Sequence, residues 1–190
     1  MKTTGKFTPQ HWSKRSPIIL SAAALMLLAG ASGTQAYTPQ YGADAGVYLP
    51  TSSTVKNLLG STWYSISPAF GAIGYDTNKG SVGIDLSVLF NSHDGNHVLL
   101  APVGLKYTQG IGSPGDTIYP YFSVAGDAAI VSVDIPNSTI SNSTTVVPSG
   151  EALLGLSFGD RAFLEAGYRA VGSTKGLSFS GGEANVGIRF

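Results

Sequence analysis

One short segment, SHDGNH at residues 92–97, holds the residue types that most often carry hydrolysis or acyl transfer. In such sites an imidazole base activates a serine or a water molecule. Adjacent residues of one turn seldom point at a common reacting atom, and Asp94-Gly95 is a strong signal for a two-residue hairpin turn. His93 and His97 also fall short of the about three protein ligands that a catalytic zinc ion needs. We therefore predict a hairpin turn here, with no catalytic residue, no metal site and no cofactor.

A second set of reactive side chains is charged and evenly spaced. Glu165 and Arg169 are four residues apart, and Glu183 and Arg189 are six apart. Residues separated by an even number share one face of a β-strand, so this spacing predicts ion pairs between neighbouring strands. Because buried charges require partners, we expect a polar plug, with a path for protons or solutes as the alternative. The full set is Asp44, Asp85, Lys106, Asp127, Glu151, Glu165, Arg169, Glu183 and Arg189.

Alternating strands must position these charges. Eight runs alternate apolar and polar residues with period two and are separated by residues that favour turns. In the clearest run, Ser81–Asn91, Leu89 is the one apolar residue on the polar face. Pro68 predicts an irregularity in the run Trp63–Tyr75. All nine charges fall on the polar face of their runs. The runs are Tyr41–Leu49, Trp63–Tyr75, Ser81–Asn91, Leu99–Thr108, Tyr119–Val133, Glu151–Phe158, Ala162–Val171 and Glu183–Phe190.

The chain is poor in charge for its length and has the start of an exported protein. Of its 190 residues 12% are charged, whereas about 25% is usual in a soluble domain. The absence of cysteine excludes disulfides and thiolate metal sites, and a net charge of zero argues against nucleic-acid binding. Basic residues before position 17, an apolar run over 17–30 and small residues up to Ala36 predict a signal peptide over 1–36 that is cleaved after Ala36. Residues 37–190 then form one domain with seven bases and eleven acids, a net charge of 7 − 11 = −4.

The scarcity of charge indicates that the apolar face of the strands meets lipid. The polar face consists mainly of Gly, Ser and Ala, which suits the narrow interior of an eight-stranded barrel. The two longest connections, Thr51–Thr62 and Asp134–Pro148, fall at the same end, and a helical turn is expected within Thr51–Gly60. Aromatic residues gather near both strand ends, as in interfacial girdles. They are Tyr75, Tyr107, Tyr119, Phe158 and Phe190 at one end and Tyr48, Trp63, Tyr64, Phe90 and Tyr168 at the other.

With its last run ending in Ile188-Arg189-Phe190, the chain over residues 37–190 resembles small outer-membrane barrels of the OmpA, OmpX and OmpW type. Its closing strand, with Ile188 and Phe190, resembles the signal that the outer-membrane assembly machinery reads in that family. The resemblance implies an all-β, eight-stranded, antiparallel, up-and-down transmembrane barrel in the outer membrane. The expected partners are outer-membrane lipid, the assembly machinery and an unidentified extracellular partner of the loop Asp134–Pro148, but no nucleic acid.

For such a barrel we expect a passive structural or surface-exposed role rather than an enzymatic one. Two alternatives stay open. One is a narrow pore or a conduit for hydrophobic molecules. The other is a lipid-modifying enzyme that uses His93 or His97.

Overall fold

The computed structural model describes residues 40–71, 80–111, 117–136, 138, 143–159 and 161–190. The predicted signal peptide, residues 1–36 with cleavage after Ala36, lies outside these residues and stays a prediction. No helix in the described ranges is long and apolar enough to cross a membrane.

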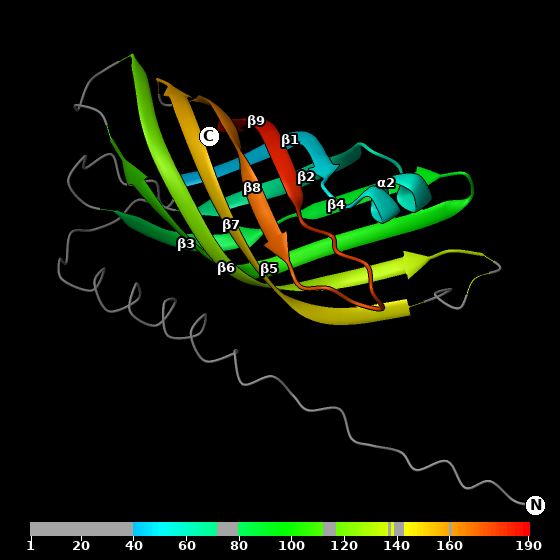
Figure 1. Cartoon of the computed structure of the whole chain (residues 1–190). Coiled ribbons are helices and arrows are strands. Elements are labelled where there is room, and N and C mark those ends of the chain that lie inside the picture. Colours follow the sequence, from blue (N-terminus) through cyan, green and yellow to red (C-terminus); the bar gives the residue numbers. More distant parts are fainter. Residues whose placement is uncertain (1–39, 72–79, 112–116, 137, 139–142, 160) are drawn as a thin grey trace, which may run out of the picture. The chain divides into compact units, whose positions relative to one another are not determined.

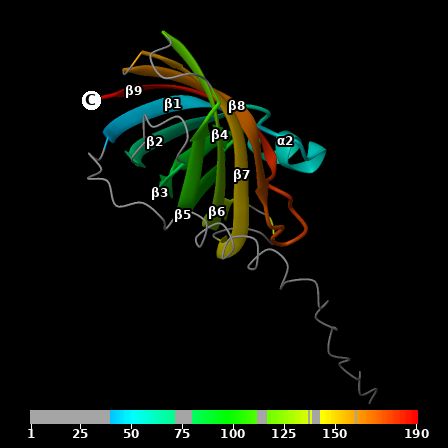
Figure 2. The ribbon, with the colours of Figure 1, turned by 90° about the vertical axis from the view of Figure 1, so that its left-hand side faces the viewer.

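Nine β-segments close into one antiparallel sheet around an interior (Figure 1, Figure 2). β3 and β4 are two halves of one strand interrupted at Ser87, so the barrel has eight strands. Each strand pairs with its neighbours in sequence, and β1 pairs with both β2 and β9. The predicted all-β, eight-stranded antiparallel barrel is confirmed. Its segments are β1 (Gln40–Pro50), β2 (Trp63–Gly71), β3 (Ser81–Leu86), β4 (Val88–His93), β5 (Asn96–Gly110), β6 (Ile118–Asp134), β7 (Ser143–Phe158), β8 (Ala162–Val171) and β9 (Gly181–Arg189).

The two ends of the barrel differ (Figure 1). We call one the C-terminal end, because β1 begins there and Gly42 of β1 pairs with Arg189 just before the last residue. We call the other the helix end, because it carries α2 (Ser53–Leu59) between β1 and β2. The β4–β5 turn and the β6–β7 and β8–β9 connections also lie at the helix end.

The strands expose their apolar face and bury their polar face. The exposed fraction is 69% for Leu154 and 63% for Val186, whereas it is 2% for Arg169 and 6% for Glu183. Soluble proteins show the opposite arrangement, in which charged residues are almost never fully buried. The alternation that the sequence predicts therefore places the charges inside.

Leu89 keeps this alternation, although it is the apolar exception on a polar face. The pairs Leu86–Val103 and Leu89–Leu100 belong to one continuous register with β5, so the chain does not slip at the interruption between β3 and β4. Leu89 points inward and has no exposed surface. Its apolar character has its own structural role, because it packs in the interior near the helix end.

The helical turn expected over Thr51–Gly60 is α2. The Ser52 hydroxyl caps its start by accepting a hydrogen bond from the Val55 amide at 3.4 Å. Gly60 ends it with a φ of 84°, a left-handed backbone that glycine adopts readily. Val55 and Leu59 are fully buried, so one side of the helix seals the interior at this end.

The prediction of a loop over Asp134–Pro148 is wrong for the second half of that range. β6 runs as far as Asp134 and β7 already begins at Ser143, so the connection is confined to residues 135–142. The start of β7 is rich in threonine and valine, whose branched side chains favour strands. Val147 there points inward and is only 6% exposed, which explains why the strand continues through a segment with Ser and Pro at its borders.

The predicted aromatic girdle at the helix end is only partly correct. Tyr64, Phe90 and Tyr168 do point outward, with exposed fractions between 38% and 58%. Tyr48 and Trp63 instead have no exposed surface and lie inside the barrel. Aromatic residues near a strand end serve the interior as well as the outer face, and sequence position does not distinguish the two roles. On the opposite end Tyr75 lies outside the described residues, while Phe158 and Phe190 are exposed.

Candidate functional site

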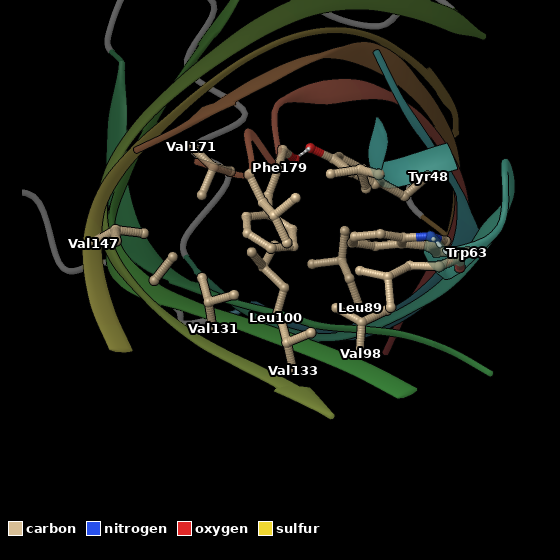
Figure 3. Packing of buried hydrophobic residues seen from close by; sticks show 14 of the residues in the cluster. Tyr48, Trp63, Leu89, Val98, Leu100, Val131, Val133, Val147, Val171 and Phe179 are labelled. Atoms are coloured by element: carbon tan, nitrogen blue, oxygen red, sulfur yellow. Dashed lines mark hydrogen bonds between the residues drawn. The ribbon is translucent and has the colours of Figure 1, made fainter. Parts of the chain in front are cut away.

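The interior is divided into an apolar layer near the helix end and a charged network nearer the C-terminal end. In the apolar layer (Figure 3) the Trp63 ring lies 5.6 Å from that of Tyr48 and 6.3 Å from that of Phe179. The Trp63 indole donates hydrogen bonds to the carbonyls of Leu59 at 3.1 Å and Gly60 at 3.0 Å, which ties β2 to α2. The members of the apolar layer are Tyr48, Val55, Leu59, Trp63, Leu89, Val98, Leu100, Ala129, Val131, Val133, Ile135, Val147, Val171, Leu177 and Phe179.

Sequence reasoning missed this apolar layer. Its signal is a set of large apolar residues on the face that otherwise carries charge, such as Leu89, Leu100 and Val131. They cluster at the ends of their strands nearest the helix end. Leu177 and Phe179 come from the β8–β9 connection, and no periodicity marks them.

Arg169 of β8 is the centre of the charged network. Its guanidinium donates to a carboxylate oxygen of Asp127 at 2.9 Å and of Asp85 at 3.2 Å. It forms an ion pair with Glu151, which lies directly opposite it on β7, and its Nε lies 3.7 Å from Glu183. One cation therefore neutralises carboxylates from four other strands.

Lys106 of β5 is the second cation of the network. Its ammonium lies 3.3 Å from a carboxylate oxygen of Glu151 and 3.6 Å from one of Glu165. Glu165 also accepts a hydrogen bond of 2.9 Å from the Tyr121 hydroxyl. Glu151 thus joins the two cations. Five carboxylates meet two cations here, all on the inward face.

Among the described residues, Arg189 lies apart from this cluster and forms none of the predicted ion pairs between neighbouring strands, whereas Arg169 of β8 does pair with Glu183 of β9. The Arg189 guanidinium donates to the Ser157 hydroxyl at 2.7 Å and stacks 4.6 Å from the centre of the Phe163 ring. Cation–π contact and a neutral hydroxyl take the place of a carboxylate. Arg189 and Glu183 both point inward from β9, but their side chains turn to different partners.

Asp44 of β1 is the remaining luminal acid. It faces Ser67 of β2 in the β1–β2 register and accepts a hydrogen bond from that side chain. Its Oδ1 atom is buried without a hydrogen-bond partner, and Asp44 forms no ion pair within the described ranges. The structure thus places all nine predicted charges on the inward face, and ion pairs between described residues join seven of them.

The two histidines do not form one site. Ser92 pairs with His97 and His93 pairs with Asn96 across the hairpin, so the two imidazoles lie on opposite faces of the β4–β5 ribbon. His93 Nε2 lies 3.5 Å from the exposed carboxylate of Asp94. In the described part of the chain, no group of three or more His, Cys, Asp or Glu side chains is arranged to hold a metal ion.

Comparison with solved structures gives the same architecture. The Neisserial surface protein A has 21% identity to this chain and a TM-score of 0.63, over 82% of this chain and 98% of its own. The N-terminal β-barrel domain of Pseudomonas aeruginosa OprF has 19% identity and a TM-score of 0.53, over 82% of this chain and all of its own. No family model and no curated protein matches the chain. The chain therefore has the fold of these small barrels, as the sequence resemblance predicts.

Proposed function

We propose that the chain is a small outer-membrane barrel protein with a passive structural or surface-exposed role, whose lumen is occupied by its own side chains. The observation that carries this proposal is the reversal of burial around the sheet, with apolar side chains outside and charges inside. Every strand contributes a large, exposed apolar residue. Examples are Val47 on β1, Ile66 on β2, Ile84 on β3, Val103 on β5, Ile130 on β6, Leu154 on β7, Leu164 on β8 and Val186 on β9.

Bilayer physics supports this proposal. A closed sheet pairs its backbone groups without exposing an edge, which is what hydrocarbon demands of a spanning structure. An arginine or lysine facing lipid at the midplane of a barrel costs about 2–4 kcal/mol. Arg169 and Lys106 avoid this cost because both point to the interior and meet carboxylates there.

In this proposal the helix end is extracellular and the C-terminal end is periplasmic. Export depends on the predicted signal peptide that ends at Ala36, and assembly depends on a machinery that reads Ile188 and Phe190. Both residues face outward, with exposed fractions of 58% and 79%. An outward apolar pair at the last strand is accessible to a protein that binds the barrel before it inserts into lipid.

The side chains that fill the interior support a narrow pore less well than they support a passive role. α2, Trp63 and Phe179 close over the lumen at the helix end, and Arg169 lies across its middle with four carboxylates around it. In planar bilayers we expect no stable single-channel steps. Steps that disappear in Asp127→Asn or Glu165→Gln would replace the passive role by conduction through the charged network.

Cell fractionation tests the proposal as a whole. We expect the protein in the outer-membrane fraction and expect a change in its gel mobility on boiling, because a folded barrel resists the detergent until it is heated. Recovery in the soluble periplasmic fraction, with the same mobility before and after boiling, would overturn the proposal.

A further inference from the structure

Two carboxylates of the charged network lie on either side of one glycine. Gly104 of β5 pairs with Asp85 of β3 on one side and with Asp127 of β6 on the other. The register places all three residues on the inward face, and glycine has no side chain to keep the two acids apart. A Cβ atom at Gly104 would lie 2.5 Å from Asp127 Oδ1, so this oxygen extends over Gly104 toward the strand that carries Asp85.

The two acids also meet at a single nitrogen atom. Asp127 Oδ2 lies 2.9 Å from Arg169 Nη1, and Asp85 Oδ2 lies 3.2 Å from the same atom. The two carboxylate oxygens therefore cannot be farther apart than these two distances together. The side chain of Asp127 has no exposed surface and that of Asp85 is 8% exposed, so solvent does little to screen one acid from the other.

Arg169 does not neutralise both acids. Its guanidinium also forms an ion pair with Glu151, and its Nε lies 3.7 Å from Glu183. The second cation of the network, Lys106, is held by Glu151 and Glu165. Acids therefore outnumber bases in the described network. Two carboxylates that share one buried site do not both keep their charge, because the repulsion between them favours a proton on one.

A proton also completes the hydrogen bonding of the pair. The side chains of Asp85 and Asp127 are close enough for a hydrogen bond. Two ionised carboxylates have no hydrogen to form it, because each of them only accepts. Asp127 Oδ1 is accordingly buried without a hydrogen-bond partner in the described part of the chain. One proton supplies the donor that the pair lacks.

We propose that Asp85 and Asp127 hold one proton between them, so that the middle of the lumen is a proton-binding site. The proton replaces repulsion across Gly104 by a hydrogen bond, while Arg169 stays bonded to both acids. Without it, two like charges compete for one nitrogen, and one carboxylate should leave Arg169. The charged groups that face the pair from the surrounding strands are Asp44 of β1, Lys106 of β5, Glu151 of β7, Glu165 and Arg169 of β8 and Glu183 of β9.

Isotope-edited infrared spectroscopy at pH 7 tests this site in the protein folded into phospholipid vesicles. Aspartate labelled with 13C at Cγ shifts the carbonyl band of a protonated aspartic acid and leaves the bands of glutamic acid unchanged. We expect such a band in the parent protein. Asp85→Asn and Asp127→Asn should each abolish it, because the remaining acid then ionises and accepts a hydrogen bond from the new amide.

Two variants serve as controls. Asp94→Asn makes the same change in the exposed β4–β5 turn, and Asp44→Asn makes it at the luminal acid outside the pair. Both should keep the band. Its persistence in Asp85→Asn would assign the proton to Asp127 alone, and its loss in Asp44→Asn with retention in both pair variants would assign it to Asp44. Either result overturns the shared proton.

The parent protein alone also decides the question if a pair variant fails to fold. In micelles, the 13Cγ chemical shifts of Asp85 and Asp127 should both differ from that of the ionised, exposed Asp94. A shift equal to that of Asp94 for either acid, or the absence of the infrared band from the parent, overturns the proposal. If the parent changes gel mobility on boiling but lacks the band, the proton site fails while the proposed function stands.

Discussion

Replacing Arg169 by alanine perturbs the charged network at its centre. The change removes hydrogen bonds to Asp127 at 2.9 Å and Asp85 at 3.2 Å, together with the ion pairs to Glu151 and Glu183. Two hydrogen bonds to charged groups contribute about 3–6 kcal/mol together. Removing one partner from a buried ion pair costs about 3–5 kcal/mol. With Arg169 only 2% exposed, we expect a loss of about 3–5 kcal/mol in the free energy of unfolding at pH 8.

Urea unfolding from phospholipid vesicles measures this loss, and Trp63 fluorescence reports on it because Trp63 is the one tryptophan after the predicted signal peptide. Arg161→Ala, which shortens an exposed arginine in the β7–β8 connection, is the matched control and should unfold like the parent protein. Adding Asp127→Asn to Arg169→Ala should cost less than the sum of the two changes, because one unpaired carboxylate is then absent. A loss below about 1 kcal/mol for Arg169→Ala, the size typical of solvent-exposed ion pairs, would refute a buried network.

Two further substitutions test the apolar layer and the outer face. Trp63→Phe removes the indole bonds to α2, so we expect a loss of about 1–3 kcal/mol in the free energy of unfolding and faster hydrogen exchange at the amide of Gly60, measured by urea titration and NMR. Ala166→Arg places a charge on the outer face at the middle of β8, where we expect a cost of about 2–4 kcal/mol, while Thr144→Arg at the helix end of β7 should cost about 0–1 kcal/mol in the same vesicles. Unaltered exchange in the first case, or equal tolerance of arginine at both positions in the second, would contradict the corresponding assignment.

Period-two alternation predicts the barrel wall because inward and outward environments differ so strongly. A charge costs several kcal/mol on a lipid-facing surface, so selection of residue types is strict there. This strictness is why the inward placement of residues as different as Asp85 and Arg169 can be predicted without knowing the register. The register itself depends on the turns, and alternation alone does not indicate which carboxylate faces which cation. The predicted ion pairs between neighbouring strands are therefore found for Arg169, which meets Glu151 and Glu183, but not for Arg189 among the described residues.

The interior was harder to predict, because the inward face accepts both charged and apolar residues. Val131 and Leu100 lie on the same face of their strands as Asp127 and Lys106. The apolar pair differs from the charged pair only in its position along the barrel axis. The position of a residue along the barrel axis depends on where its strand starts relative to the neighbouring strands. Period-two alternation of residue types does not determine this. For the same reason Trp63 could be expected in an outer girdle, although its indole is bonded to α2 inside.

The charged network does not reach every strand of the barrel wall. Arg169 of β8 joins carboxylates on β3, β6, β7 and β9, and Lys106 of β5 joins carboxylates on β7 and β8. Six of the eight strands are therefore tied across the lumen by ion pairs between described residues, and the two outside this set are β1 and β2. In the described ranges β2 is held to its later neighbour by four register pairs, and Asp44 of β1 keeps an unsatisfied carboxylate oxygen beside it. Within the described residues, register pairs are fewest and no ion pair crosses between β2 and the strand made of β3 and β4, so the wall should open there first.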